Sequence, residues 1–123
     1  MKIRIYDNSI RLRLDRQEVE AIGAAKTVLG RTDFPGDVVF EYALSVSDRG
    51  DVTARFSERR IEVVLPEGWA NHWAGDDSEV SIRAAVGTTS GSLGVLVEKD
   101  FECLEPRSGE DQSNRFKNPK AMA

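Results

Sequence analysis

The chain has 123 residues, of which 40% are hydrophobic and 31% charged, and its formal net charge is −4. These values are typical of one soluble globular domain that can bury a core of its own. No apolar run approaches the roughly 20 residues of a membrane-spanning helix, and the opening residues lack the apolar segment of a signal peptide. We therefore expect a cytoplasmic protein with no membrane partner. The negative charge also argues against nucleic acid as the partner.

The chain holds a single cysteine, Cys103, and a single histidine, His72. One cysteine cannot form an internal disulfide, which fits a reducing compartment. Two such residues also fall short of the four Cys and His ligands of the usual structural zinc sites.

Residues 2–14 predict a β-hairpin. Two segments that alternate charged and apolar residues flank the turn-forming Asp7-Asn8-Ser9. Alternation places one set of side chains on the apolar face: Ile3, Ile5, Ile10, Leu12 and Leu14. The other face is basic and carries Lys2, Arg4, Arg11 and Arg13.

A short helix is predicted next. Asp15 is suited to the N-cap, and Glu18 three residues later completes a capping box. Val19 and Ile22 form its apolar stripe, and Gly30 is suited to its C-terminal end. A strand over 38–46 follows, with Phe40, Tyr42 and Leu44 on one face.

The same order of elements then begins again. Alternating residues predict strands over 52–56 and 61–65, and Pro66 opens a helix with Trp69, Ala70 and Trp73 as its buried stripe. Further strands are expected over 80–84 and 93–97, joined by a glycine-containing link at 87–91.

An offset of about 51 residues superimposes the two halves by pattern, for example Ile10 on Ile61 and Leu14 on Leu65. We therefore predict a pseudo-twofold internal duplication of a strand–strand–helix–strand unit. The copies are residues 2–46 and 52–97, which together form a body over 1–97. Residues 98–123 are predicted to be an irregular C-terminal tail that packs on this body with loose last residues.

The predicted fold class is α+β, with about eight mainly antiparallel strands and two short helices. Two helices of about ten residues cannot cover a flat eight-stranded sheet. We therefore expect a strongly curved sheet or a partly closed barrel, with a homodimer as the other way to cover the apolar faces and strand edges.

The clustered basic residues are candidates for an anion-binding site. They are Lys2, Arg4, Arg11, Arg13, Arg55 and Arg83. Pointing into a barrel, they would form a tunnel in which guanidinium groups meet phosphate oxygens. Pointing to solvent, they would be an ordinary exterior with cross-strand ion pairs worth about 0.2–1 kcal/mol each. The apolar residues on the opposite face favour the exterior interpretation.

A second group of residues offers ligands for a metal ion or a redox site. The candidates are Asp100, Cys103, Glu110, Asp111 and His72. Carboxylates suit hard cations, and a thiolate with an imidazole suits transition metals. No known motif spacing occurs among them, so a solvated acidic tail is the alternative.

Three segments together carry a family resemblance: the opening residues 1–14, Val-Glu-Lys-Asp-Phe-Glu-Cys-Leu at 97–104, and Glu-Asp-Gln-Ser-Asn-Arg-Phe-Lys-Asn-Pro at 110–119. The chain resembles a family of short bacterial proteins of unknown function over nearly its whole length, and this likeness implies no activity. The alternating strands are also similar to those of triphosphate-tunnel enzymes of the CYTH type. That family's opening strand carries glutamates where Lys2, Arg4 and Tyr6 stand here, so only an analogy of fold is implied.

These observations lead to one main hypothesis and two alternatives. The main hypothesis is a small binding or interaction protein, non-enzymatic and homodimeric, whose ligand and cofactor the sequence does not identify. One alternative is a divalent-metal-dependent phosphate or nucleotide enzyme, with Arg4, Arg11, Arg13 and Arg55 on phosphates and Glu41 or Glu62 on the metal. The other alternative is a metal or redox site around Cys103.

Overall fold

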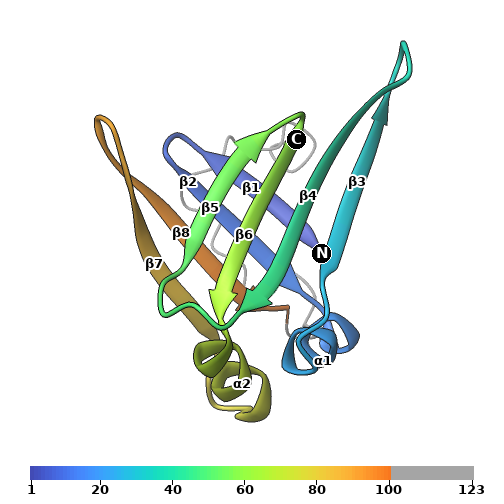
Figure 1. The fold of residues 1–123 in the computed structure, drawn as a ribbon. Helices are drawn as coiled ribbons and strands as arrows, with labels where there is room; N and C mark the ends of the chain where they lie inside the picture. The colour runs from blue at the N-terminus through green and yellow to red at the C-terminus, as the bar shows by residue number, and fades with distance from the viewer. Residues whose placement is uncertain (101–123) are drawn as a thin grey trace, which may run out of the picture.

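The computed structural model describes residues 1–100, which form two helices and eight strands in two four-stranded sheets (Figure 1). In chain order the elements are β1 (Lys2–Tyr6), β2 (Ser9–Leu14), α1 (Arg16–Gly23), β3 (Val28–Phe34), β4 (Val38–Ser47), β5 (Thr53–Ser57), β6 (Arg60–Pro66), α2 (Glu67–Gly75), β7 (Ser81–Thr88) and β8 (Gly91–Lys99). The predicted α+β class is confirmed. Neither helix in this part of the chain has the length and apolar character needed to cross a membrane.

Each sheet combines one hairpin from each half of the chain. The strand orders are β1-β2-β8-β7 and β3-β4-β6-β5. Hairpin partners pair antiparallel, whereas the central contacts, β2 with β8 and β4 with β6, are parallel. Both sheets are therefore mixed, and they depend on pairing between strands that are distant in the sequence.

The expectation of a partly closed barrel or a strongly curved sheet is wrong. Over residues 1–100 the strands form two separate sheets that do not close into a barrel. Their apolar faces contribute to one hydrophobic cluster, and both helices lie at the same end of the molecule (Figure 1). Two sheets that cover one another have no need to close, because each hides the apolar face of the other.

The core is drawn from both sheets and both helices. Its fully buried large side chains are Leu12, Leu14, Ile22, Leu44, Val63, Leu65, Trp73 and Val97. The predicted alternation holds in the first hairpin, where Ile3 lies opposite Leu12 and Ile5 opposite Ile10. The helices pack closely on one another, since a Cβ added at Gly23 would lie 3.0 Å from the Cβ of Ala74.

Helix α1 begins as the sequence predicts and ends earlier. The Asp15 carboxylate accepts a hydrogen bond from the backbone N–H of Glu18, and the Glu18 carboxylate accepts one from the backbone N–H of Asp15, which completes the capping box. The helix ends at Gly23, and Ala25 adopts a positive φ of 58°. Gly30 does not end the helix but lies inside β3, a strand the sequence pattern did not reveal.

Helix α2 has the predicted end at Gly75, but Pro66 is its N-cap and the last residue of β6. Trp73 is buried and donates its indole N–H to the carbonyl of Val80 at 3.0 Å. Trp69 was predicted to share this buried stripe, yet 47% of its surface is exposed. The expectation was wrong because the inner face of so short a helix is filled by Ala70 and Trp73.

Candidate functional site

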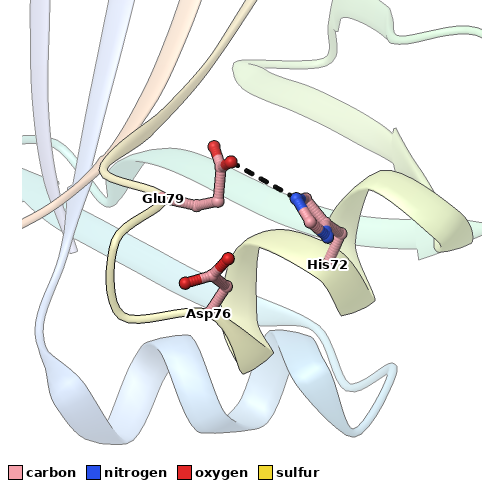
Figure 2. Close-up of side chains that lie close together, drawn as sticks. All are labelled: His72, Asp76 and Glu79. Carbon is pink, nitrogen blue, oxygen red and sulfur yellow. Dashed lines mark hydrogen bonds and ion pairs between the residues drawn. The ribbon is translucent and has the colours of Figure 1, made fainter.

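The C-terminal end of α2 brings three potential metal ligands together: His72, Asp76 and Glu79 (Figure 2). Their nearest ligand atoms all lie within 4.8 Å of one another. His72 stands in the last helical turn, Asp76 is the C-cap, and Glu79 follows the turn at residues 77–78. The Nε2 atom of His72 lies 3.3 Å from Oε1 of Glu79. We call these three residues the His72 cluster.

The loop after α2 holds the Asp76 carboxylate in place and fixes the backbone of Glu79. One oxygen of Asp76, Oδ1, accepts hydrogen bonds from the backbone N–H of Ser78 at 2.9 Å and from its hydroxyl at 2.7 Å. The backbone N–H of Glu79 donates to the carbonyl of Asp76 at 3.0 Å, and Lys99 Nζ donates to the same carbonyl at 2.8 Å. These hydrogen bonds close the loop. They use Oδ1 and the carbonyl of Asp76, and none of them uses Oδ2.

Hydrogen bonds from Ser78 hold the pKa of Asp76 below its ordinary value, first through the hydroxyl and then through the backbone N–H. Electrostatic interactions with the neighbouring His72 and Lys99 side chains lower the pKa of Asp76 further, by smaller amounts. Asp76 is consequently a carboxylate at neutral pH, which is the form that binds cations.

The second candidate site is a row of arginines on the outward face of the first sheet. Arg4 lies opposite Arg11, Arg11 opposite Leu96, and Leu96 opposite Arg83, so one line of side chains crosses all four strands. We call Arg4, Arg11 and Arg83 the arginine row. Their side chains point away from the core, because successive strand residues alternate between faces and the adjacent Ile3, Ile10, Leu12 and Ile82 pack in the core.

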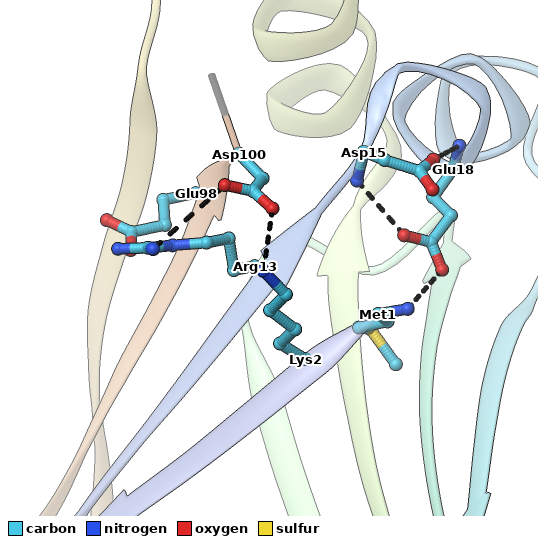
Figure 3. Close-up of polar contacts among 7 residues, drawn as sticks. All are labelled: Met1, Lys2, Arg13, Asp15, Glu18, Glu98 and Asp100. Atoms are coloured by element: carbon cyan, nitrogen blue, oxygen red, sulfur yellow. Dashed lines mark hydrogen bonds and ion pairs between the residues drawn. The ribbon is translucent and has the colours of Figure 1, made fainter. Parts of the chain in front are cut away.

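A neighbouring row nearer the helices carries charges that neutralise one another (Figure 3). Lys2 lies opposite Arg13, and Arg13 lies opposite Glu98. Arg13 is 2.9 Å from Glu98 and 4.0 Å from Asp100, while Lys2 is 3.2 Å from Asp100. Asp100 also donates its backbone N–H to the carbonyl of Leu14 at 2.8 Å. Two basic and two acidic groups are thus matched.

The arginine row has far less compensation. Arg11 lies 3.7 Å from Glu98, a carboxylate that Arg13 already contacts at 2.9 Å, and within residues 1–100 neither Arg4 nor Arg83 has a carboxylate within 4.0 Å. Two like charges directly opposite one another on adjacent strands are destabilising. The direct pairing of Arg4 with Arg11 is therefore a local conflict that an anion would relieve.

Shallow recesses flank Arg11 on this face. One of about 300 Å³ is lined by Arg4, Tyr6, Ser9 and Arg11. Another of about 260 Å³ lies beside Arg11, Arg83, Gly94 and Leu96. Gly94 stands opposite Ser9 on the outward side, and the lack of a side chain there leaves the floor open.

The outward face of the second sheet is balanced. Arg31, Arg55 and Arg60 are matched by Asp33, Glu41 and Glu62. Arg55 lies directly opposite Glu62 and is 3.3 Å from it. The residues that sequence analysis grouped as anion-binding candidates are therefore divided: five lie on the first sheet, and Arg55 lies on the second.

The sequence-derived metal candidates are also separated. His72 lies in the His72 cluster, whereas Asp100 pairs with Lys2 and Arg13. Cys103, Glu110 and Asp111 lie outside the described residues. Sequence reasoning missed Asp76 and Glu79. Their spacing of four and seven residues from His72, around a predicted helix end, was the available signal.

A further recess of about 300 Å³ lies where α1, α2 and the end of β8 meet. Its lining includes Leu14, Val19 and Ala74 together with Arg16, Glu20, Asp77, Lys99 and Asp100. Charges of both signs line it, so it favours no one class of ligand.

Comparison with known proteins yields a family without an assigned activity. No curated protein and no solved structure matches the chain. The model of a protein family described as a family of unknown function (DUF7009) matches residues 1–120, which is nearly the whole chain. The chain therefore belongs to the family of unknown function DUF7009.

Proposed function

We propose that this chain is a binding protein whose arginine row takes a ligand carrying two or more phosphate groups. The observation that carries the proposal is the charge imbalance between the two outward faces. Within residues 1–100, Arg4, Arg11 and Arg83 on the first sheet have one carboxylate among them, Glu98 at 3.7 Å from Arg11, whereas each arginine of the second sheet has an acidic partner.

The chemistry of arginine supports a phosphate ligand. A guanidinium group is planar and presents forked donors that match phosphate oxygens. Arg4 and Arg83 lie on the two edge strands of the sheet, three strand spacings or about 14 Å apart at the backbone. Because both side chains are long, their guanidinium groups can approach one another more closely than this. The open floor at Gly94 gives the ligand room to approach the sheet between them.

Binding, and not the metal-dependent enzyme, is the better-supported reading of these groups. The enzyme alternative required Glu41 or Glu62 to hold a metal beside phosphates bound by Arg4, Arg11 and Arg13. Both glutamates lie on the outward face of the other sheet, where Arg55 and Arg60 are their partners. The two sets of groups do not meet at one ligand.

The proposal predicts that Arg11→Glu weakens binding of inorganic tripolyphosphate at least tenfold, measured by isothermal titration calorimetry at low salt. The substitution places a glutamate directly opposite Arg4, as Glu62 lies opposite Arg55 in the other sheet. The fold should therefore tolerate it. Tenfold corresponds to about 1.4 kcal/mol, within the range of charge-assisted hydrogen bonds. Affinity should also fall as salt rises, because these arginines are exposed.

Arg55→Ala is the matched control for Arg4→Ala, since the two arginines occupy equivalent places in their hairpins. Only Arg4→Ala should weaken binding. Equal losses from both variants would mean non-specific attraction to positive charge, and no binding by the unmodified chain would refute the proposed function.

We infer in addition that the chain arose by internal duplication. In the hairpin of β1 and β2, Ile3 lies opposite Leu12 and Ile5 opposite Ile10. The residues 51 positions later pair in the same way in the hairpin of β5 and β6, where Ala54 lies opposite Val63 and Phe56 opposite Ile61. The parallel contacts correspond as well: Ser9↔Gly94 matches Glu41↔Arg60, because Arg60 follows Ser9 by 51 residues and Gly94 follows Glu41 by 53. Equivalent registers in both sheets support a common origin of the halves.

The homodimer stays a prediction, and an apolar rim at the hairpin end supports it. Ile5, Phe34 and Phe56 extend the inward faces of the sheets there, and 52–68% of each is exposed. We expect sedimentation velocity at micromolar concentration to give a dimer, and Phe56→Ser to shift it toward monomer. A monomeric parent chain would contradict this assembly.

A further inference from the structure

The His72 cluster is independent of the arginine row, and its ligand set belongs to another class of chemistry. It offers one imidazole nitrogen and two carboxylates at the end of a helix. Imidazole with carboxylate suits zinc and related divalent transition metals, whereas magnesium and calcium prefer oxygen ligands alone. We propose that His72, Asp76 and Glu79 form a binding site for a divalent transition metal ion such as Zn²⁺.

The spacing of the donors fits such an ion. Two ligands about 2.1 Å from a tetrahedral zinc lie roughly 3.4 Å apart. The Nε2 atom of His72 is 3.3 Å from Oε1 of Glu79, which is already this separation. The third donor, from Asp76, lies within 4.8 Å of the others. A small rotation of the exposed His72 side chain or of the half-buried Glu79 side chain brings the three donors within range of one ion.

The backbone prepares the site. Ser78 holds Oδ1 of Asp76, so the carboxylate does not need to be ordered when the ion arrives. The carbonyl of Asp76 accepts from Glu79 N, and Trp73 Nε1 holds the carbonyl of Val80, so the loop between them is fixed at both ends. Three protein ligands leave at least one coordination position for water or a substrate.

The charges around the cluster also call for a cation. The C-terminal end of a helix carries partial negative charge, which favours Lys, Arg or protonated His in the last turn. Here the residues beyond Gly75 include Asp76, Asp77 and Glu79. Lys99, which contacts the carbonyl of Asp76, offsets part of this charge and will lower the affinity for a metal ion. A local arrangement that opposes helix stability is typical of functional sites.

The test uses the tag-free chain, in which His72 is the only histidine. Its two ring C–H signals in a proton NMR spectrum therefore report on this site alone. We expect one equivalent of ZnCl₂ to shift or broaden these signals, with saturation at the same ratio in calorimetry. MgCl₂ at the same concentration should leave them unchanged.

Three substitutions separate the cluster from general acidity. His72→Ala and Glu79→Gln should each weaken zinc binding at least tenfold, because even the loss of an outer partner of a metal ligand costs about 10–100-fold. Asp77→Asn removes the same charge as Glu79→Gln from a neighbouring position outside the cluster and should leave the affinity within about twofold. Thermal unfolding of each variant without metal checks that the fold is intact.

Two outcomes would overturn the proposal. One is zinc binding that leaves the His72 signals in place, as binding through Cys103 alone would do; Cys103→Ser identifies that case. The other is an equal loss of affinity in Asp77→Asn and Glu79→Gln, which would mean diffuse attraction to an acidic loop. Neither result depends on phosphate binding at the arginine row, so failure of one proposal leaves the other standing.

Discussion

Replacing Trp73 with alanine is expected to lower the free energy of unfolding by about 3–5 kcal/mol, the range observed for deleting a buried aromatic side chain. Only 1% of Trp73 is exposed, and its ring belongs to the cluster shared by both sheets and both helices. The substitution also removes the indole donor and leaves the carbonyl of Val80 without that partner. Urea denaturation followed by circular dichroism measures the change.

Trp69→Ala is the control on the same helix. Because 47% of Trp69 is exposed, its loss should cost about half as much as the loss of Trp73, or less. A comparable loss from the two variants would show that the helix, and not the buried ring, determines the change. The loss of Trp73 also removes a smaller stabilising contact, the cation–π interaction with Lys99, whose Nζ lies 5.5 Å from the centre of the Trp73 ring.

The local features of the fold were predictable from the sequence. Period-two alternation in residues 2–14 sufficed for the first hairpin, because one face is buried and a shift of one residue would expose it. The capping box at Asp15 and Glu18 was likewise recognisable, since both side chains act within three residues of one another. Such signals depend on neighbours in the chain and need no knowledge of the tertiary structure.

The pairing of strands between halves was not predictable. Nothing in β2 indicates that its second neighbour is β8, more than 80 residues later in the chain. Without that contact, eight strands and two small helices suggested closure into a barrel. The parallel pairs divide the strands into two sheets instead, and the sheets cover one another.

The candidate sites were predictable to different extents. Alternation correctly placed Arg4 and Arg11 on one face, but the division of Arg55 from them required the sheet order. For His72, the residue type was recognised and the partners were not. Asp76 and Glu79 meet it only because the chain turns back directly after α2, and that turn depends on the hydrogen bonds of Ser78 and Lys99.

Strand β3 was missed for the same reason, because the role of Gly30 depends on a partner in another strand. Gly30 resembled a helix end in the sequence, whereas in β3 it lies opposite Tyr42 of β4. A Cβ at this position would come within 2.2–2.6 Å of three atoms of the Tyr42 side chain. Glycine is required because the tyrosine ring lies across the strand, not because the strand must turn. The Tyr42 hydroxyl donates to the carbonyl of Met1 at 2.8 Å and so links the second sheet to the first.

Gly30→Ala is therefore expected to lower the free energy of unfolding by about 1–3 kcal/mol, as overpacking does, although alanine is ordinarily the better residue in a strand by about 0.5–1 kcal/mol. Gly87→Ala in β7 is the matched control, since a Cβ there meets nothing within 4 Å, and it should leave stability unchanged or raise it slightly. Urea denaturation of both variants gives the comparison.

A double-mutant cycle locates the cause. If the tyrosine ring is the obstacle, Gly30→Ala should cost little in a Tyr42→Ala background, because the space is then empty and the contact with Met1 is already lost. The two losses would be strongly non-additive, as expected for residues in direct contact. Additive losses would mean that Gly30 acts through its backbone alone. The tyrosine ring would then have no part in excluding a side chain at position 30.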